Sequence, residues 1–143
     1  MITAAQCAAK FGDPILHESR FMRLYDIGAS NHWALLILPR KIYMNTMMFP
    51  MFIQALENVK QADLCKCVKT WDGCFNVRKK RGGSSLSLHS WGMAFDINAA
   101  WNRFGMKPTM SKEFVDCFKA AGFDWGGDWK KPDGMHFQPA KFV

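Results

Sequence analysis

The chain has 143 residues, of which 49% are hydrophobic and 22% are charged, and its formal net charge is +7. These values exclude a disordered tail, and the length is sufficient for one hydrophobic core without disulfide or metal staples. We therefore predict a single domain over residues 1–143. The positive charge predicts attraction to an anionic partner: nucleic acid, a membrane surface or an acidic polymer such as cell wall.

Targeting signals are not evident in the sequence. The start, MITAAQCAAKFGDP, lacks the basic and then apolar segments of a secretory signal, and the longest strongly apolar run, WALLILP, is too short to span a bilayer. These features predict a soluble protein made in the cytoplasm. For such a compartment an odd number of cysteines predicts reduced thiols rather than a disulfide framework. The five are Cys7, Cys65, Cys67, Cys74 and Cys117.

Two helices are predicted in the first half of the chain. Thr3 can cap a helix over residues 4–11, which the sequence G-D-P ends. Residues 45–62 place apolar side chains at helical spacing, and Pro50 is tolerable there only near the start of the helix. The apolar positions are Met48, Phe52, Ala55, Leu56 and Val59.

The second half of the chain predicts short strands and one further helix. Ser111 can cap a helix whose apolar positions recur every three to four residues until Gly122 stops it. A glycine-rich basic loop is predicted over residues 72–85. Strands are predicted over residues 66–71, 92–98 and 135–138. This order of helices and strands predicts an α+β fold, with a small antiparallel sheet and flanking helices.

The segment SLHSWGMAFD combines a histidine and an aspartate at an unusual spacing. Gly92 permits a sharp turn into a strand, whose alternation then puts Ala94 and Asp96 on one face. His89, before the turn, can fold back toward that face, and the small Ala94 leaves space between the two polar side chains. The spacing is therefore explained if His89 and Asp96 point at one common object.

A second acid and histidine pair, Asp133 and His136, lies in the segment DGMH. Two histidines and a carboxylate are a common zinc set in hydrolases, with a fourth position left for water. Asp133 is then available to take a proton from that water and return it to a leaving amine. The alternative is that both histidines are core residues and both aspartates cap turns. We predict that core role for His17 and His32.

These segments carry a resemblance to a known family. SLHSWGMAFD resembles the S-x-H-x-x-G-x-A-x-D signature of the VanY-like zinc D-alanyl-D-alanine carboxypeptidases and L-alanyl-D-glutamate endopeptidases, a family that includes phage endolysins. DGMHF resembles its second signature, an acid three residues before the last zinc histidine. GFDWGGDW is similar to a segment of the endolysin branch. The resemblance covers roughly residues 70–138.

The resemblance implies a role for each matching residue and a fold like that of the hedgehog and D,D-peptidase group. Asp133 would be the catalytic base, and Ser87, before the first histidine, a substrate contact. In the family, an arginine upstream of the first histidine binds a substrate oxygen or carboxylate. Arg78 would supply it here, although it lies two residues further along than the family pattern S-G-Y-R has it. The implied zinc ligands are His89, Asp96 and His136.

The identity of the acid at position 133 indicates which activity within the family to expect. Carboxypeptidases of the family usually carry Glu there, whereas Asp together with W-G-G resembles phage L-alanyl-D-glutamate endopeptidases. We therefore expect a monomeric zinc peptidase that cleaves peptidoglycan stem peptides as a phage endolysin. It would be made in the host cytoplasm and act on the wall after release, and its basic surface could hold it to anionic wall or membrane. A D-alanyl-D-alanine carboxypeptidase is the alternative within the family.

Two other readings of the sequence compete with the peptidase. The run RKKRGG beside aromatic residues could be a nucleic-acid patch, although single basic runs are usually solvated loops, and we expect no nucleic-acid partner. Such a module would keep a salt-dependent affinity for DNA after loss of His89. The pair CKC with Cys74 could hold a structural zinc, but C-x-C departs from the usual C-x-x-C spacing and a fourth ligand is not evident.

Overall fold

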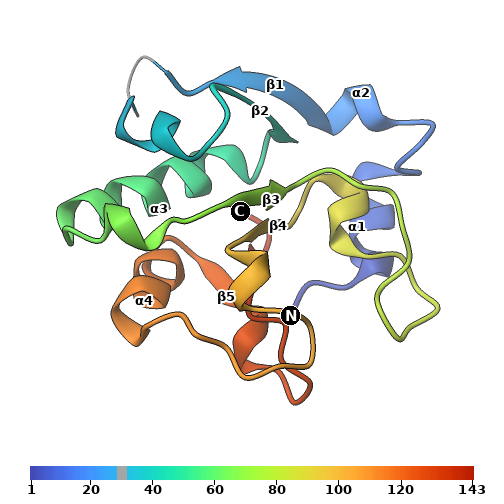
Figure 1. Ribbon diagram of the computed structural model, residues 1–143. Coiled ribbons are helices and arrows are strands. Elements are labelled where there is room, and N and C mark those ends of the chain that lie inside the picture. The colour runs from blue at the N-terminus through green and yellow to red at the C-terminus, as the bar shows by residue number, and fades with distance from the viewer. Residues whose placement is uncertain (29–31) are drawn as a thin grey trace.

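The computed structural model describes residues 1–28 and 32–143, and of His32 the backbone alone. These residues form four α-helices and two antiparallel sheets, which confirms the α+β class (Figure 1). No helix among them has the length and apolar character needed to cross a bilayer. The helices are α1 (Ala4–Phe11), α2 (Glu18–Phe21), α3 (Phe49–Gln61) and α4 (Lys112–Ala120).

The two sheets are a hairpin and a four-stranded sheet. The hairpin pairs β1 (Met22–Asp26) with β2 (Lys41–Asn45). The larger sheet has the strand order β3-β4-β6-β5, so that β4 and β6 lie at its centre. Its strands are β3 (Trp71–Gly73), β4 (Phe95–Ile97), β5 (Phe123–Trp125) and β6 (His136–Pro139).

One contiguous cluster of buried apolar side chains joins the sheet to the helices. Phe95 of β4 lies at its centre, and α3 and α4, which pack against each other, contribute Phe52 and Phe118 to it. Phe137 of β6 stacks on Phe95, with ring centroids 5.5 Å apart. Because side chains alternate along a strand, the residues next to these two phenylalanines point to the opposite face of the sheet.

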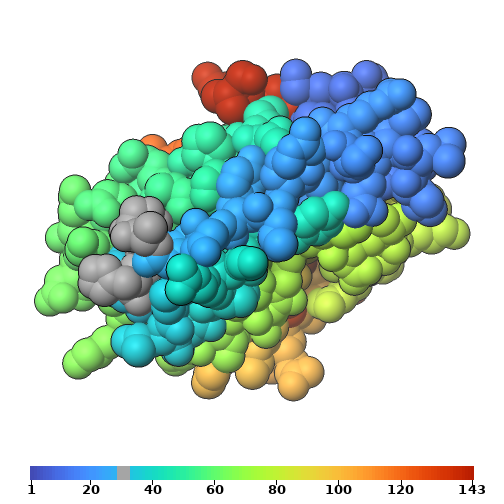
Figure 2. All heavy atoms as spheres, turned by 90° about the horizontal axis from the view of Figure 1, so that it is seen from above, coloured from blue at the N-terminus to red at the C-terminus, as the bar shows by residue number. Residues whose placement is uncertain are grey.

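Helix α1 and the C-terminal segment pack beside each other on one side of the molecule. Figure 2 shows the C-terminal residues, in red, next to the N-terminal segment, in blue. Phe142 makes an edge contact with Phe11 at the end of α1, with ring centroids 5.9 Å apart. The Lys10 ammonium lies 5.2 Å from the centre of the Phe142 ring. These contacts attach α1 and the C-terminal segment to each other.

The predicted helices are confirmed because their signals are local. Thr3 forms a capping box with Gln6 at the start of α1. Pro50 lies in the first turn of α3, where its missing N–H costs nothing. The Ser111 hydroxyl accepts a hydrogen bond from the Phe114 N–H at the start of α4. Helix α3 buries Phe52, Ala55, Leu56 and Val59, as its spacing predicts.

The predicted strands are less accurate. The strand expected over residues 66–71 is wrong for most of its length, because residues 65–67 form a 3-10 turn and β3 begins only at Trp71. The strand expected over 92–98 is shorter, and only residues 95–97 pair as β4. Strand β6 confirms the expectation for 135–138 to within a residue. Strands β1, β2 and β5 were not predicted.

Gly92 makes the turn that the sequence analysis requires, and it allows a test by substitution. Its φ of 62° is left-handed, and an added Cβ would lie 2.4 Å from Met22 Sδ and 2.9 Å from the Asn45 backbone N. Gly92→Ala should lower the free energy of unfolding by about 1–2 kcal/mol through the backbone alone, and further through the clash with Asn45. Urea denaturation measures the loss.

Gly82→Ala is the matched control for this substitution. Gly82 has a similar φ of 70°, but nothing lies within 4 Å of an added Cβ. Its loss should therefore contain the backbone cost alone. An equal loss of unfolding free energy in Gly82→Ala and Gly92→Ala would contradict the close packing described around Gly92.

Candidate metal centre

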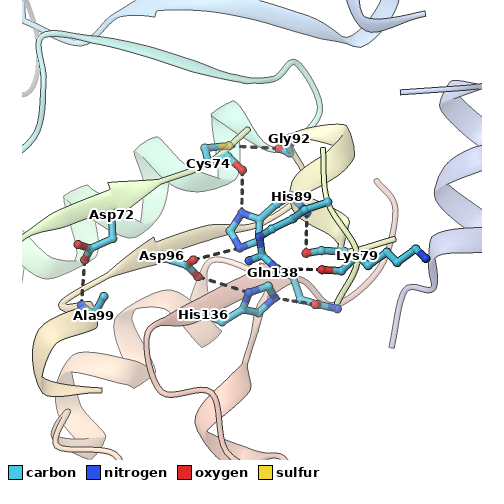
Figure 3. A network of polar contacts seen from close by, with 11 residues as sticks. Asp72, Cys74, Lys79, His89, Gly92, Asp96, Ala99, His136 and Gln138 are labelled. Carbon is cyan, nitrogen blue, oxygen red and sulfur yellow. Dashed lines mark hydrogen bonds and ion pairs between the residues drawn. The ribbon is translucent and has the colours of Figure 1, made fainter. Parts of the chain in front are cut away.

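Three buried polar side chains meet on the face of the sheet opposite the aromatic core. His89 comes from a 3-10 turn (Leu88–Trp91), Asp96 from β4 and His136 from β6 (Figure 3). Their exposed fractions are 3%, 8% and 6%. One nitrogen or oxygen atom of each lies within 4.8 Å of those of the other two. The structure thus brings the three predicted ligands into one group that could hold a metal ion.

The pairing of β4 with β6 places two of these side chains opposite each other. Asp96 is the register partner of His136, and Phe95 is the partner of Phe137. Residues directly opposite on antiparallel strands have neighbouring side chains on the same face. The same alternation that buries the two phenylalanines in the core therefore presents the carboxylate and the imidazole together on the other side.

The turn that carries His89 is fixed by hydrogen bonds at both ends. The Ser87 hydroxyl accepts a hydrogen bond from the His89 backbone N–H, at 3.3 Å, and so caps the turn. Gly92 closes the turn in its left-handed conformation. His89 Nδ1 lies 2.7 Å from the Cys74 carbonyl oxygen. Because a carbonyl can only accept, Nδ1 donates to it, and Nε2 is the ring nitrogen that faces Asp96, 3.2 Å away.

His136 is oriented by a different side chain. Its Nε2 lies 2.9 Å from Gln138 Oε1, two residues along β6 and on the same face of the sheet. With Nε2–H donating to this oxygen, Nδ1 faces Asp96 Oδ1, 3.4 Å away. Hydrogen bonds of this kind fix the tautomer of a metal-binding histidine. The two imidazoles therefore present different ring nitrogens, Nε2 and Nδ1, to the same carboxylate.

The electrostatics of this group fit a cation. Burial would raise the pKa of Asp96, but the adjacent His136 and His89 rings more than offset it and hold that pKa well below its usual range. The carboxylate is therefore ionised. Among the described residues, His89 Nε2 and Asp96 Oδ1 are buried without a hydrogen-bond partner. Two imidazole nitrogens and a carboxylate are a donor set that suits zinc and would satisfy both atoms.

Gln138 was missed in the sequence analysis, and its contact with His136 can be tested. Gln138→Ala should weaken metal affinity by about 10- to 100-fold, the usual effect of removing such a partner. Titration of the metal-free protein with zinc against a competing chelator measures the affinity. Gln54→Ala is the control, because Gln54 bonds only to Asn58 on an exposed face of α3. An unchanged affinity in Gln138→Ala would show that His136 needs no orienting partner.

Asp133 lies beside the group but is not one of its members. Its backbone N–H donates to the Gly126 carbonyl at 2.8 Å, and its carbonyl accepts from the His136 N–H at 3.1 Å. A Cβ on residue 126 would lie 2.4 Å from the Asp133 backbone carbonyl oxygen, so the glycine at this position of the W-G-G segment permits the close approach of the two backbones. Burial raises the pKa of Asp133, which the charge of Asp96 also favours. A raised pKa suits a carboxyl that exchanges protons near neutral pH.

A cleft opens over Asp133 and His136. Ser87, Arg78 and Arg81 line it, together with the aromatic rings of Phe104 and Trp129. The Arg78 side chain donates to the Lys79 carbonyl, whereas the charge of Arg81 acts on Asp133. Arg81 was missed because it lies in the loop read as a solvated basic run. The course of this loop in the folded protein places Arg81 in the cleft.

The remaining sequence predictions concern the other histidines and the cysteines. His17 is half-buried rather than in the core, and its Nδ1 accepts a hydrogen bond from the Asp13 N–H at 3.0 Å. The His32 side chain lies outside the described residues. All five cysteines are free thiols, and burial raises the pKa of Cys7 to about 12. Within the described segments, the cysteines form no group of three or more that could hold a metal ion.

The α+β fold, a buried histidine–aspartate–histidine group that could hold a metal ion and an acid beside it are an arrangement that suits metal-dependent hydrolysis. Residues 81–139 match a family model described as D-alanyl-D-alanine carboxypeptidase. The matched segment contains every residue of the group and Asp133, and it supports, in general terms, a peptidoglycan-acting metallopeptidase. No curated protein matches the chain significantly.

Proposed function

We propose that the protein is a zinc-dependent peptidase that cleaves the L-alanyl-D-glutamate bond of peptidoglycan stem peptides and acts as a phage endolysin. The observation that carries the proposal is the buried group of His89, Asp96 and His136, with the Asp133 carboxyl beside it in an open cleft. In this proposal the protein is made in the host cytoplasm and reaches the wall after release. Its net charge of +7 favours contact with an anionic wall.

Each residue of the site has a task in this proposal. His89 Nε2, His136 Nδ1 and an Asp96 oxygen would hold the zinc ion. When bound, zinc polarises the substrate carbonyl and lowers the pKa of water. Asp133 takes the proton of the attacking water on its carboxylate and returns it to the leaving amine. This task requires Asp133 to alternate between two protonation states, which its raised pKa supports.

The cleft supports a peptide substrate that carries negative charge. Arg78 and Arg81 line it from one loop, and Ser87 lies with them close to the base. An arginine there can bind a substrate carboxylate or the developing oxyanion, as the resemblance implies for Arg78. The Trp129 ring centroid lies 5.1 Å from that of His136, and this ring gives the cleft an apolar side.

The choice of bond depends on Asp133 and the W-G-G segment, both of which resemble the endopeptidase branch. Aspartate is one methylene shorter than glutamate, and Gly126 lets the chain of Asp133 approach closely, which supports a differently shaped pocket. The description of the matching family favours the second candidate, a carboxypeptidase that releases terminal D-alanine.

Digestion of purified sacculi, followed by mass spectrometry of the products, distinguishes the two candidates. Cleavage at L-alanyl-D-glutamate should release stem peptides that begin with D-Glu and retain their terminal D-Ala. The L-Ala residue should remain on the muramic acid. Free D-alanine as the main product, without such peptides, would favour the carboxypeptidase and leave the metal site unaffected.

A further inference from the structure

A second hollow opens beside Asp96, next to the cleft over Asp133. Arg81 and Phe104 line both hollows and so form the boundary between them. The other walls of the second hollow include Ala99, Ala100, Met135 and Arg103. It therefore adjoins the metal centre while having residues of its own, and the proposed peptidase chemistry gives those residues no task.

Neither arginine of this hollow forms an ion pair with a residue in the described part of the chain. Neither the Arg81 nor the Arg103 guanidinium makes a hydrogen bond or ion pair there, whereas Arg40, an arginine of the hairpin, pairs with Asp26 at 3.0 Å. A guanidinium is always charged and presents several N–H groups in a planar fork that matches a carboxylate. Two such groups around one hollow are suited to an anion supplied from outside.

The two carboxylates in the hollow are already engaged by other groups. Asp72 accepts hydrogen bonds from the Thr70 hydroxyl at 2.7 Å and the Ala99 backbone N–H at 2.9 Å, and Figure 3 shows it turned toward Ala99. Asp96 faces the two histidines of the metal centre. Both carboxylates are thus held by other partners, and neither forms an ion pair with Arg81 or Arg103.

Four residues give the otherwise polar hollow an apolar part. Ala99 and Ala100 contribute only methyl groups, and Met135 and Phe104 are apolar neighbours. The Lys131 ammonium lies 4.7 Å from the centre of the Phe104 ring and adds positive charge at the edge. A short aliphatic chain suits such an apolar part, and a carboxylate at its end would reach the arginines.

We propose that this hollow binds a substrate side chain that ends in a free carboxylate, and that Arg103 is the residue that determines this specificity. The inference rests on the proposed peptidase function and adds a second anchoring point for the stem peptide. Substituting Arg103 gives a clearer test than substituting Arg81, because Arg81 also lines the cleft over Asp133, where its charge acts on that carboxyl. Changing Arg103 therefore perturbs this hollow without altering the surroundings of the base.

Two synthetic substrates test the proposal. Both are N-acetyl-L-Ala-D-Glu peptides with diaminopimelic acid as third residue, and they differ only in that its side-chain carboxylate is free or amidated. The protein should cleave the free acid with a kcat/KM about tenfold higher or more, the effect of one charge-assisted contact. In Arg103→Gln this ratio should fall to about one. In Arg103→Lys, which keeps the charge but not the planar fork, it should be intermediate.

Lys107→Gln is the matched control, because it removes an exposed cation of the same segment that does not line the hollow. The ratio of the two kcat/KM values should be unchanged in this variant. A ratio near one in the parent protein, or an unchanged ratio in Arg103→Gln, would overturn the inference while hydrolysis itself supports the peptidase. Failure of the parent protein to cleave either peptide or sacculi would instead overturn the proposed function, and this inference with it.

Discussion

Replacing His89, Asp96 and His136 together by alanine is expected to remove zinc from the protein and to abolish hydrolysis of peptidoglycan. The three side chains supply every donor of the buried group, so the variant loses all three proposed ligands. Elemental analysis of the purified variant measures the zinc content per chain. Circular dichroism checks that the helices, which lie outside the site, are retained.

The double variant Cys65→Ser and Cys67→Ser is the control for this experiment. These two cysteines lie in the 3-10 turn after α3, away from the three ligands, and the variant should keep both zinc and activity. Stoichiometric zinc retained in the triple alanine variant would contradict the assignment and direct attention to the cysteines.

Asp133→Asn is expected to leave zinc in place and to lower turnover by about 100-fold or more, the usual loss when a general base is removed. Asparagine has nearly the same shape, so the backbone contacts of this residue with Gly126 and His136 should persist. The amide cannot accept the proton of the attacking water. Zinc content and the rate of release of new amino groups from sacculi are measured on the same sample.

Asp116→Asn is the matched control for the loss of one carboxylate. Asp116 lies on α4 and pairs only with the exposed Lys112, so zinc content and turnover should both remain unchanged. If Asp133→Asn lost zinc in proportion to its loss of activity, Asp133 would be a ligand. The roles proposed for positions 96 and 133 would then be exchanged.

The sequence predicts those parts of the fold whose signals lie within one or two turns of the chain. The cap at Thr3, the proline in the first turn of α3 and the cap at Ser111 each act on neighbouring residues, so the helix positions follow from the sequence alone. The three grouped side chains were found for a similar reason. Each lies in a short motif whose glycine or strand alternation constrains its direction.

Features that depend on long-range pairing could not be predicted. Strand β1 has only Met22 fully buried, so it lacks the alternation that would indicate a strand, and it exists through its pairing with β2. The contact of Gln138 with His136 becomes apparent only when both are placed on β6 facing the site. Arg81 lines the same cleft as Asp133 only because of the course of its loop, which depends on the rest of the fold.

The cross-strand position of Asp96 and His136 links the ion to folding by mass action. An ion held by both side chains is lost when β4 separates from β6, so it binds the folded chain in preference to the unfolded one. Free zinc at 100 times its dissociation constant would add about 2.7 kcal/mol to the free energy of unfolding. Purification in the presence of a chelator would therefore yield a protein that melts at a lower temperature as well as one without activity.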